Sequence, residues 1–251
     1  MSESDTLQSL VTMSRALGDP AHDYAIIGEG NSSARRDAET FYVKASGYSL
    51  GSIGPEGFVA VRFAPVLALF AQPDLPLAEQ QTVISNARLD PAAPHPSLEF
   101  SLHAMLLDAL PDVHYIGHTH PTAVNQILCS NRAEQFAYHC LFPDQITVCG
   151  PAAYIPYTPP GLTLARVIRD AVQAHADEHG APPKLILMQN HGMIALGKSP
   201  REVLNITAMC VKAARVFAGA CALGEPVFMT DEQVAHILHR PDEAVRVKLF
   251  S

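Results

Sequence analysis

Two histidines separated by a single residue constrain this chain more than any other feature. His118 and His120 stand in the stretch Gly117–Pro121, and residues at positions i and i+2 share a face in an extended strand. Imidazoles that converge on one point are a common way to grip a metal ion, because three of them with a carboxylate or water form an open zinc-type site. The motif therefore predicts a strand that ends at the metal site of an enzyme.

The residues before this strand predict a helix that carries a carboxylate. Residues 96–97 provide an N-cap, and Glu99 falls in the first turn, where the helix dipole favours a negative charge. Glu99 and His103 share one face of this helix. The opposite, apolar stripe comprises Leu98, Leu102, Met105, Leu106 and Ala109. Since a strand over 113–120 follows directly, we expect Glu99 and the histidine pair to lie close together.

A third histidine lies far downstream. The apolar stretch 184–189 predicts a strand, Asn190-His191-Gly192 a tight turn, and 193–196 the returning strand. Taken alone, each of these signals has an ordinary explanation, because Asn and Gly are common turn residues and a carboxylate is favourable in any first helical turn. The ordered combination of Glu99 with three histidines is what indicates a metal site.

The rest of the chain mixes helices, strands and proline-rich turns, which is typical of an α/β fold. Ser199, Pro200 and Glu202 mark the start of a long closing helix. The other expected elements are a helix over 7–17, a loop over 28–33, strands over 40–44 and 58–61, a loop over 72–96 with five prolines, and a helix from Pro121 to Leu128. With 251 residues, we expect one domain over 1–251.

Charge and cysteine pattern argue against several classes of protein. The formal net charge is −8 without a basic run, so we expect no nucleic-acid partner. The apolar stretch 203–223 carries Lys212 and Arg215, and the N-terminus has no signal-peptide pattern, so we expect no membrane partner and a cytoplasmic protein. Five cysteines without a CxxC pair indicate reduced thiols rather than a disulfide framework.

Five blocks in a fixed order resemble the class II aldolase/adducin family over about residues 7–225. The blocks are Gly30-Asn31-Ser32, Lys44-Ala45-Ser46-Gly47, Pro96-Ser97-Leu98-Glu99, His118-Thr119-His120-Pro121 and Asn190-His191-Gly192. The resemblance implies a three-layer α/β/α fold with a central, mainly antiparallel sheet, assembled as a homotetramer with active sites between subunits. It also implies a divalent metal on His118, His120 and His191, with zinc first and Mn²⁺, Co²⁺ or Fe²⁺ as alternatives, and a catalytic Glu99.

The reaction implied by the resemblance is retro-aldol cleavage of a small hydroxy-carbonyl compound, such as a sugar or sugar phosphate. The metal would stabilise the enediolate as a Lewis acid. Glu99 would transfer a proton, either directly or after it releases the metal when substrate arrives. A decarboxylase, 4-epimerase or dehydratase using the same site stays open. So does a non-catalytic adducin-like interaction module, although adducin-like heads have lost metal ligands that are present here.

In phosphate-binding relatives, loops of this pattern cradle a phosphate through backbone N–H groups and hydroxyls. The substrate-binding residues implied here are Gly30, Asn31, Ser46, Gly47 and Ser97. Leu98 replaces a second serine, so an unphosphorylated sugar acid or another carboxylate is an alternative occupant, with Lys44 as a candidate counter-charge. Some relatives add a tyrosine from the neighbouring subunit, and Tyr138 and His139 lie in the corresponding region.

Overall fold

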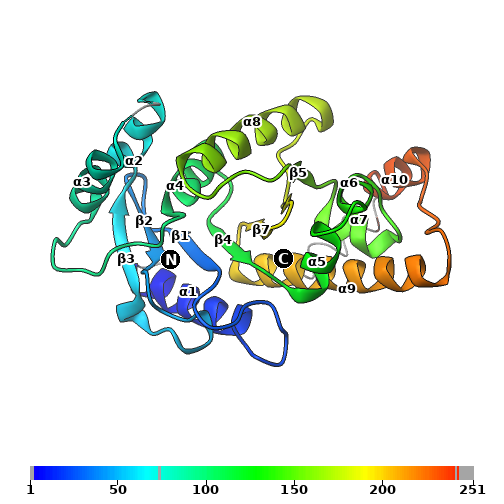
Figure 1. The fold of residues 1–251 in the computed structure, drawn as a ribbon, viewed down its shortest axis with the longest axis horizontal. Helices are drawn as coiled ribbons and strands as arrows, with labels where there is room; N and C mark the ends of the chain where they lie inside the picture. Colours follow the sequence, from blue (N-terminus) through cyan, green and yellow to red (C-terminus); the bar gives the residue numbers. More distant parts are fainter. Residues whose placement is uncertain (1–2, 73–74, 241, 243–251) are drawn as a thin grey trace.

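A mixed sheet of seven strands forms the centre of the molecule in a computed structural model that describes residues 3–72, 75–240 and 242 (Figure 1). The strands are β1 (Asn31–Arg35), β2 (Thr40–Lys44), β3 (Phe58–Arg62), β4 (Tyr115–Thr119), β5 (Ala153–Ile155), β6 (Leu185–Met188) and β7 (Gly192–Gly197). Their order in the sheet is β3-β2-β1-β4-β7-β6-β5. Only β5 and β6 pair in parallel, and the other pairs within this sheet are antiparallel.

Helices cover both faces of the sheet, which confirms the expected α/β class. In Figure 1, α1 and α9 lie along one face, and α2, α4 and α8 lie on the other. The helices are α1 (Glu3–Leu17), α2 (Phe63–Ala68), α3 (Leu77–Ala87), α4 (Phe100–Ala109), α5 (Thr122–Leu128), α6 (Ala133–Tyr138), α7 (Pro143–Cys149), α8 (Leu162–His179), α9 (Pro200–Leu223) and α10 (Asp231–Leu238). Short 3₁₀ turns occupy Leu50–Ser52, Pro55–Gly57 and Leu69–Ala71.

Strand β7 shows how one strand supplies both cores. Met193 and Ala195 pack in the core beneath α1 and α9, whereas Ile194 and Leu196 pack in the core beneath α4 and α8. Successive side chains of a strand point to opposite faces, so a strand covered on both sides is apolar at every position. Each fully buried aliphatic side chain contributes about 1.5–3 kcal/mol. This continuous apolar run explains why the sequence predicts β7 and β6 well.

Helix α9 begins where the sequence predicts. Ser199 caps it by accepting a hydrogen bond from the backbone N–H of Glu202 at 3.2 Å. Pro200 occupies the first turn, where its missing N–H costs nothing. The helix is long and apolar enough to cross a membrane by length and composition. Its inner face, including Val203, Ile206 and Phe217, belongs to the core of this fold.

Residues 72–96 do not form the expected loop throughout, because α3 occupies Leu77–Ala87. The prolines that suggested a loop lie outside the helix: Pro76 sits at its N-cap, and Pro91, Pro94 and Pro96 follow it. Proline is tolerated at the edges of helices and excluded from their interiors. Residues 73 and 74 lie outside the described part. The prolines therefore mark the ends of a helix, not the absence of one.

Two further expectations near the site need correction. Helix α4 begins at Phe100, so Glu99 occupies its N-cap position, and the side chain of Leu98 is 85% exposed instead of buried. The expected loop over 28–33 ends earlier, because β1 starts at Asn31 and pairs with β4. Asn31, Ser32 and Ser33 are all buried, although their polarity predicts a surface loop. Their hydrogen bonds are made to residues distant in the sequence.

Candidate metal centre and active site

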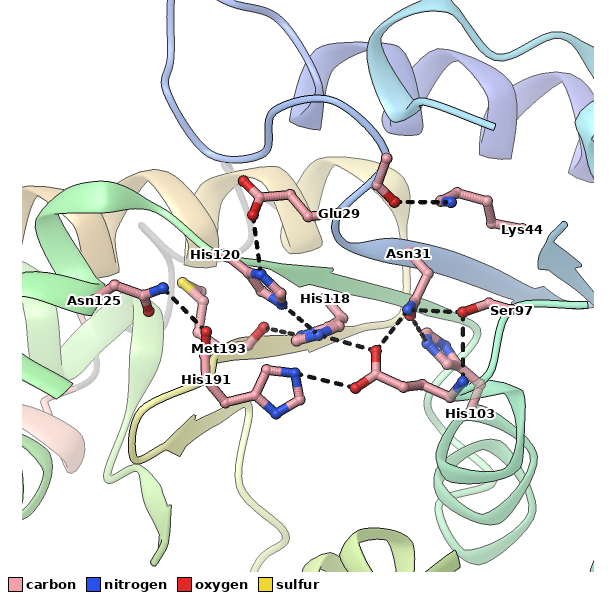
Figure 2. A network of polar contacts seen from close by, with 12 residues as sticks. Glu29, Asn31, Lys44, Ser97, His103, His118, His120, Asn125, His191 and Met193 are labelled. Atoms are coloured by element: carbon pink, nitrogen blue, oxygen red, sulfur yellow. Dashed lines mark hydrogen bonds and ion pairs between the residues drawn. The ribbon is translucent and has the colours of Figure 1, made fainter. Parts of the chain in front are cut away.

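Three histidines from β4, its end and the turn before β7 meet at one point. His118 lies in β4 opposite Ile194 of β7, His120 follows the end of β4, and His191 lies in the turn that precedes β7. Their ring centroids are 4.7, 5.0 and 5.1 Å apart. One ligand atom from each histidine lies within 4.8 Å of the others. The shared face predicted for His118 and His120 is confirmed, and the three side chains could hold a metal ion (Figure 2).

Small and turn-forming residues make this convergence possible. Asn190 adopts a left-handed conformation with φ 55°, which turns the chain toward β7. A Cβ atom on Gly192 would lie 2.6 Å from Cδ2 of His120 and 2.5 Å from the carbonyl oxygen of Thr119. Asn125 then fixes the turn, because its Nδ2 donates to the carbonyl oxygen of His191 at 3.0 Å. The absence of a side chain at Gly192 leaves room for the imidazole of His120.

The neighbours of the rings set which nitrogen faces the centre. Nδ1 of His118 donates to the carbonyl oxygen of Met193 at 2.9 Å, since a carbonyl only accepts. Nδ1 of His120 lies 3.3 Å from the carboxylate of Glu29. Nε2 of each ring is therefore left to face the centre, and these two nitrogens are 3.0 Å apart. Such outer partners fix the tautomer of metal-binding histidines.

Glu99 completes the site from the opposite side. Its Oε2 is 3.2 Å from Nε2 of His118, and its Oε1 is 3.1 Å from Nε2 of His191. Burial alone would raise the pKa of Glu99, but the charges and hydrogen bonds of these two histidines outweigh burial and hold it well below its usual range. The group is thus an ionised carboxylate in a largely enclosed site.

The histidines themselves are driven apart in basicity. Burial disfavours the charged form of His118, but the adjacent Glu99 carboxylate outweighs it and raises the pKa of His118. Burial, together with His118 and His191, lowers the pKa of His120 to about 3. His120 is therefore neutral, as a ligand must be. Three imidazoles beside a carboxylate match the donor set of open zinc-type sites, so the residues present fit a divalent metal.

The residues expected to bind substrate lie at the start of β1, where Gly30 and Asn31 stand, and on two loops, which carry Ser46 with Gly47 and Ser97. Nδ2 of Asn31 donates to Oε2 of Glu99 at 2.8 Å and to Oγ of Ser97 at 3.2 Å. Backbone bonds from Ser97 to Lys44 and from Ser46 to His95, both 2.9 Å, join the two loops. Gly30 and Gly47 have positive φ angles of 71° and 85°. Ser46, Ser97 and Leu98 border a cavity of about 840 Å³.

Three other candidates make contacts with groups outside the histidine cluster. Nζ of Lys44 donates to the carbonyl oxygen of Tyr48 at 2.7 Å, and the carbonyl oxygens of Gly28 and Ala45 are each 3.5 Å away. Tyr138 packs against Tyr154, and the ring of His139 packs against Phe228. Their assignments stay predictions. Sequence reasoning missed the contacts of Glu29 and His103 near the site. The partner of Glu29, His120, lies 91 residues away along the chain, and the partners of His103 lie about 70 residues away.

Comparison with known proteins places these features in a family. The family model for the Class II Aldolase and Adducin N-terminal domain matches residues 8–218. A curated relative, the uncharacterized oxidoreductase YuxG of Bacillus subtilis (strain 168), is 27% identical over 200 residues. That alignment covers 76% of this chain but 26% of the relative, so this chain spans about a quarter of that protein's length.

Solved structures support the same conclusion for the fold. An L-fuculose 1-phosphate aldolase has a TM-score of 0.70 and 20% identity, over 98% of this chain and 97% of that chain. YgbL from Klebsiella pneumoniae, named as an inferred aldolase/epimerase/decarboxylase, has a TM-score of 0.71 and 20% identity, over 94% and 99% of the two chains. Since the family model covers most of the sequence, the chain belongs to the class II aldolase and adducin family.

Proposed function

We propose that the protein is a metal-dependent lyase that cleaves a carbon–carbon bond in a small hydroxy-carbonyl compound by a retro-aldol reaction. The observation that carries the proposal is the position of Glu99, whose carboxylate oxygens lie 3.2 and 3.1 Å from Nε2 of His118 and His191. An ionised carboxylate beside the nitrogens of a metal site is well placed to exchange protons with a substrate bound there.

The residues divide the chemistry between them. A divalent ion held by His118, His120 and His191 would supply Lewis-acid stabilisation of the negative charge that develops on the substrate oxygens. Glu99 accepts a proton in one half of the reaction and returns it in the other. Asn31 holds Oε2 of Glu99 in place through its amide N–H. All three candidate ligands and the carboxylate are present, which favours catalysis over an adducin-like interaction module.

The substrate's far end is expected to lie near Ser46, Ser97 and Leu98. Ser46 and Ser97 border the cavity and offer hydroxyl donors, whereas the exposed side chain of Leu98 offers none. This set favours a sugar or sugar acid over a sugar phosphate. YgbL, which is similar in fold, carries epimerase and decarboxylase in its name, so these reactions at the same carboxylate and histidines are the second candidate.

A product assay tests the proposal. Protein with measured metal content is incubated with hydroxy-ketone phosphates, sugar acids and β-keto acids, and aldehyde release is the expected result. Release of CO₂, an epimerised sugar or a dehydrated product would replace the lyase by the corresponding alternative. A fully metal-loaded protein that turns over no compound of these classes would favour the interaction module.

We further propose zinc as the metal, a cytoplasmic role in carbohydrate metabolism, and a homotetramer. Imidazole ligands suit zinc among the available divalent ions. Exposed apolar side chains such as Ile27, Val216 and Leu223 offer surface for subunit contacts. Light scattering is expected to give four times the chain mass of 27.0 kDa. An active, stable monomer would overturn the assembly but leave the proposed reaction standing.

A further inference from the structure

His103 is fully buried behind Glu99, and the mechanism so far gives it no role. It lies on α4, and both of its ring nitrogens face side chains of β1. Nδ1 is 2.7 Å from Oγ of Ser33, and Nε2 contacts Oδ1 of Asn31. Figure 2 shows the amide of Asn31 joined on one side to His103 and on the other to Glu99 and Ser97. A continuous chain of hydrogen bonds therefore runs from Ser33 through His103 and Asn31 to Glu99.

The direction of every bond in this chain is fixed by its last member. An ionised carboxylate only accepts, so the atom of Asn31 that lies 2.8 Å from Oε2 of Glu99 must be the amide nitrogen. The amide oxygen then faces His103, and Nε2 of His103 must carry a hydrogen to donate to it. Nδ1 is left with a lone pair, which accepts the hydroxyl hydrogen of Ser33.

The environment of His103 agrees with this neutral form. Burial, reinforced by the nearby His118, lowers the pKa of His103 to about 3. A charged ring would carry hydrogen on both nitrogens and leave no acceptor for the Ser33 hydroxyl. The geometry and the burial therefore specify one tautomer.

We propose that His103 is a positioning residue that acts on Glu99 through Asn31. Its Nε2–H holds the amide oxygen of Asn31, so that the amide N–H is always aimed at Glu99, and Ser33 fixes the tautomer that makes this possible. An asparagine amide rotated by half a turn would place its oxygen against the carboxylate, where two acceptors repel. The kinetic consequence rests on the proposed function, whereas the tautomer and the amide orientation do not.

Nuclear magnetic resonance of the ¹⁵N-labelled, zinc-loaded full chain tests the bond directions without any substrate. The imidazole signal that disappears in His103→Gln is assigned to His103. The expected spectrum shows a neutral ring with its hydrogen on Nε2 and a pyridine-like Nδ1. A ring with hydrogen on Nδ1, or on both nitrogens, would overturn the proposal whatever reaction the protein performs.

Kinetics then test the effect on Glu99 with the substrate found by the product assay. His103→Leu removes the donor, and kcat is expected to fall about 10-fold to 100-fold, with KM and metal content nearly unchanged. His103→Gln places an amide N–H near the position of Nε2 and is expected to recover most of kcat. A merely structural role would lower stability in both variants without this split between kcat and KM. Wild-type kcat in His103→Leu would contradict the proposal.

Ser33→Ala provides a second variant if His103→Leu does not fold. It keeps the ring and removes only the hydroxyl that holds Nδ1. We expect both tautomers of His103 to appear in the spectrum and a smaller loss of kcat. A spectrum unchanged from the wild type would mean that Ser33 does not fix the tautomer, and that part of the proposal would fail.

Discussion

Strands β4 and β2, which both flank β1, each bury a basic side chain and hold it in different ways. His118 of β4 and Lys44 of β2 are 0% and 3% exposed. Nδ1 of His118 is bound to one carbonyl, which leaves Nε2 free to face Glu99 and His120. Nζ of Lys44 is surrounded by the carbonyl oxygens of Gly28, Ala45 and Tyr48. His118 keeps Nε2 directed at the centre that it shares with Glu99 and His120. Lys44 instead directs its ammonium group at backbone carbonyl oxygens.

This difference distinguishes a candidate binding site at His118 from a structural role for Lys44. A buried polar group costs free energy unless its hydrogen bonds are satisfied. Around His118, ring nitrogens of three histidines and the oxygens of Glu99 converge on one place, which is the arrangement that a bound cation requires. Around Lys44, the carbonyls of two loops satisfy the cation, so Lys44 ties the Gly28 loop to the turn that contains Tyr48. The predictions below test that division.

Loss of a metal ligand should have the largest effect. His118→Ala and His191→Ala are each expected to abolish binding of the divalent metal, because each removes one of the three candidate imidazole ligands. His191 lies in a turn and is partly exposed, so its variant tests the ligand role with less disturbance of the core. Elemental analysis of the purified proteins gives the answer, with the exposed His236→Ala as control. Undiminished metal in both variants would remove the metal site.

Replacing the carboxylate should spare the metal but not the reaction. Glu99→Gln keeps the shape of the side chain and removes the ionisable oxygen, so turnover is expected to fall roughly 10²-fold to 10⁴-fold. Metal content should largely survive on three imidazoles. If Glu99 were only a favourable carboxylate at the start of α4, the variant would lose about 1 kcal/mol of stability and keep its turnover. Kinetics at matched metal content distinguish the two.

Replacing Glu29, which contacts a candidate ligand without being one, should have a smaller effect on metal binding. Glu29 lies 3.3 Å from Nδ1 of His120 and also accepts the backbone N–H of Ile26 at 2.8 Å. Partners of this kind orient metal-binding histidines, and their loss weakens metal affinity by about 10-fold to 100-fold. Glu29→Gln is therefore expected to raise the zinc dissociation constant by that factor. Competition with a chelator measures it, and the exposed Glu39→Gln should match the wild type.

The strands and histidines of the candidate metal site are predicted well from the sequence, because strong local patterns specify them. The apolar runs of β6 and β7, the cap at Ser199 and the two-residue spacing of His118 and His120 are all local features. Strand periodicity places the two imidazoles on one face before any tertiary contact is known. The helix that directly precedes the strand predicts that Glu99 lies near them, and the family resemblance adds His191. The structure confirms that these side chains meet.

The features that the sequence did not reveal depend on partners far along the chain. Strand β1 is polar because Ser32 bonds to Ser14 and Ser33 bonds to His103 inside the protein. No periodic apolar pattern marks such a strand. Likewise, the local sequence around Glu29 indicates only a loop, because its partner His120 lies 91 positions away. Local rules predict elements whose burial is apolar, and they miss buried polar side chains whose hydrogen bonds are long-range.

Replacing Lys44 should lower the stability of the fold and leave metal binding intact. Lys44→Met keeps most of the volume but leaves the carbonyl of Tyr48 without its donor, so the free energy of unfolding is expected to fall by about 1–2 kcal/mol. Burial lowers the pKa of Lys44 in the folded protein, so the unfolded chain binds the proton more tightly. The wild type should therefore gain stability relative to Lys44→Met as pH rises from the folded pKa toward the unfolded value of about 10.4. Urea unfolding across alkaline pH measures this trend, with the exposed Lys198→Met as control. A variant that unfolds like the wild type but loses its metal would place Lys44 in the site and reverse the comparison.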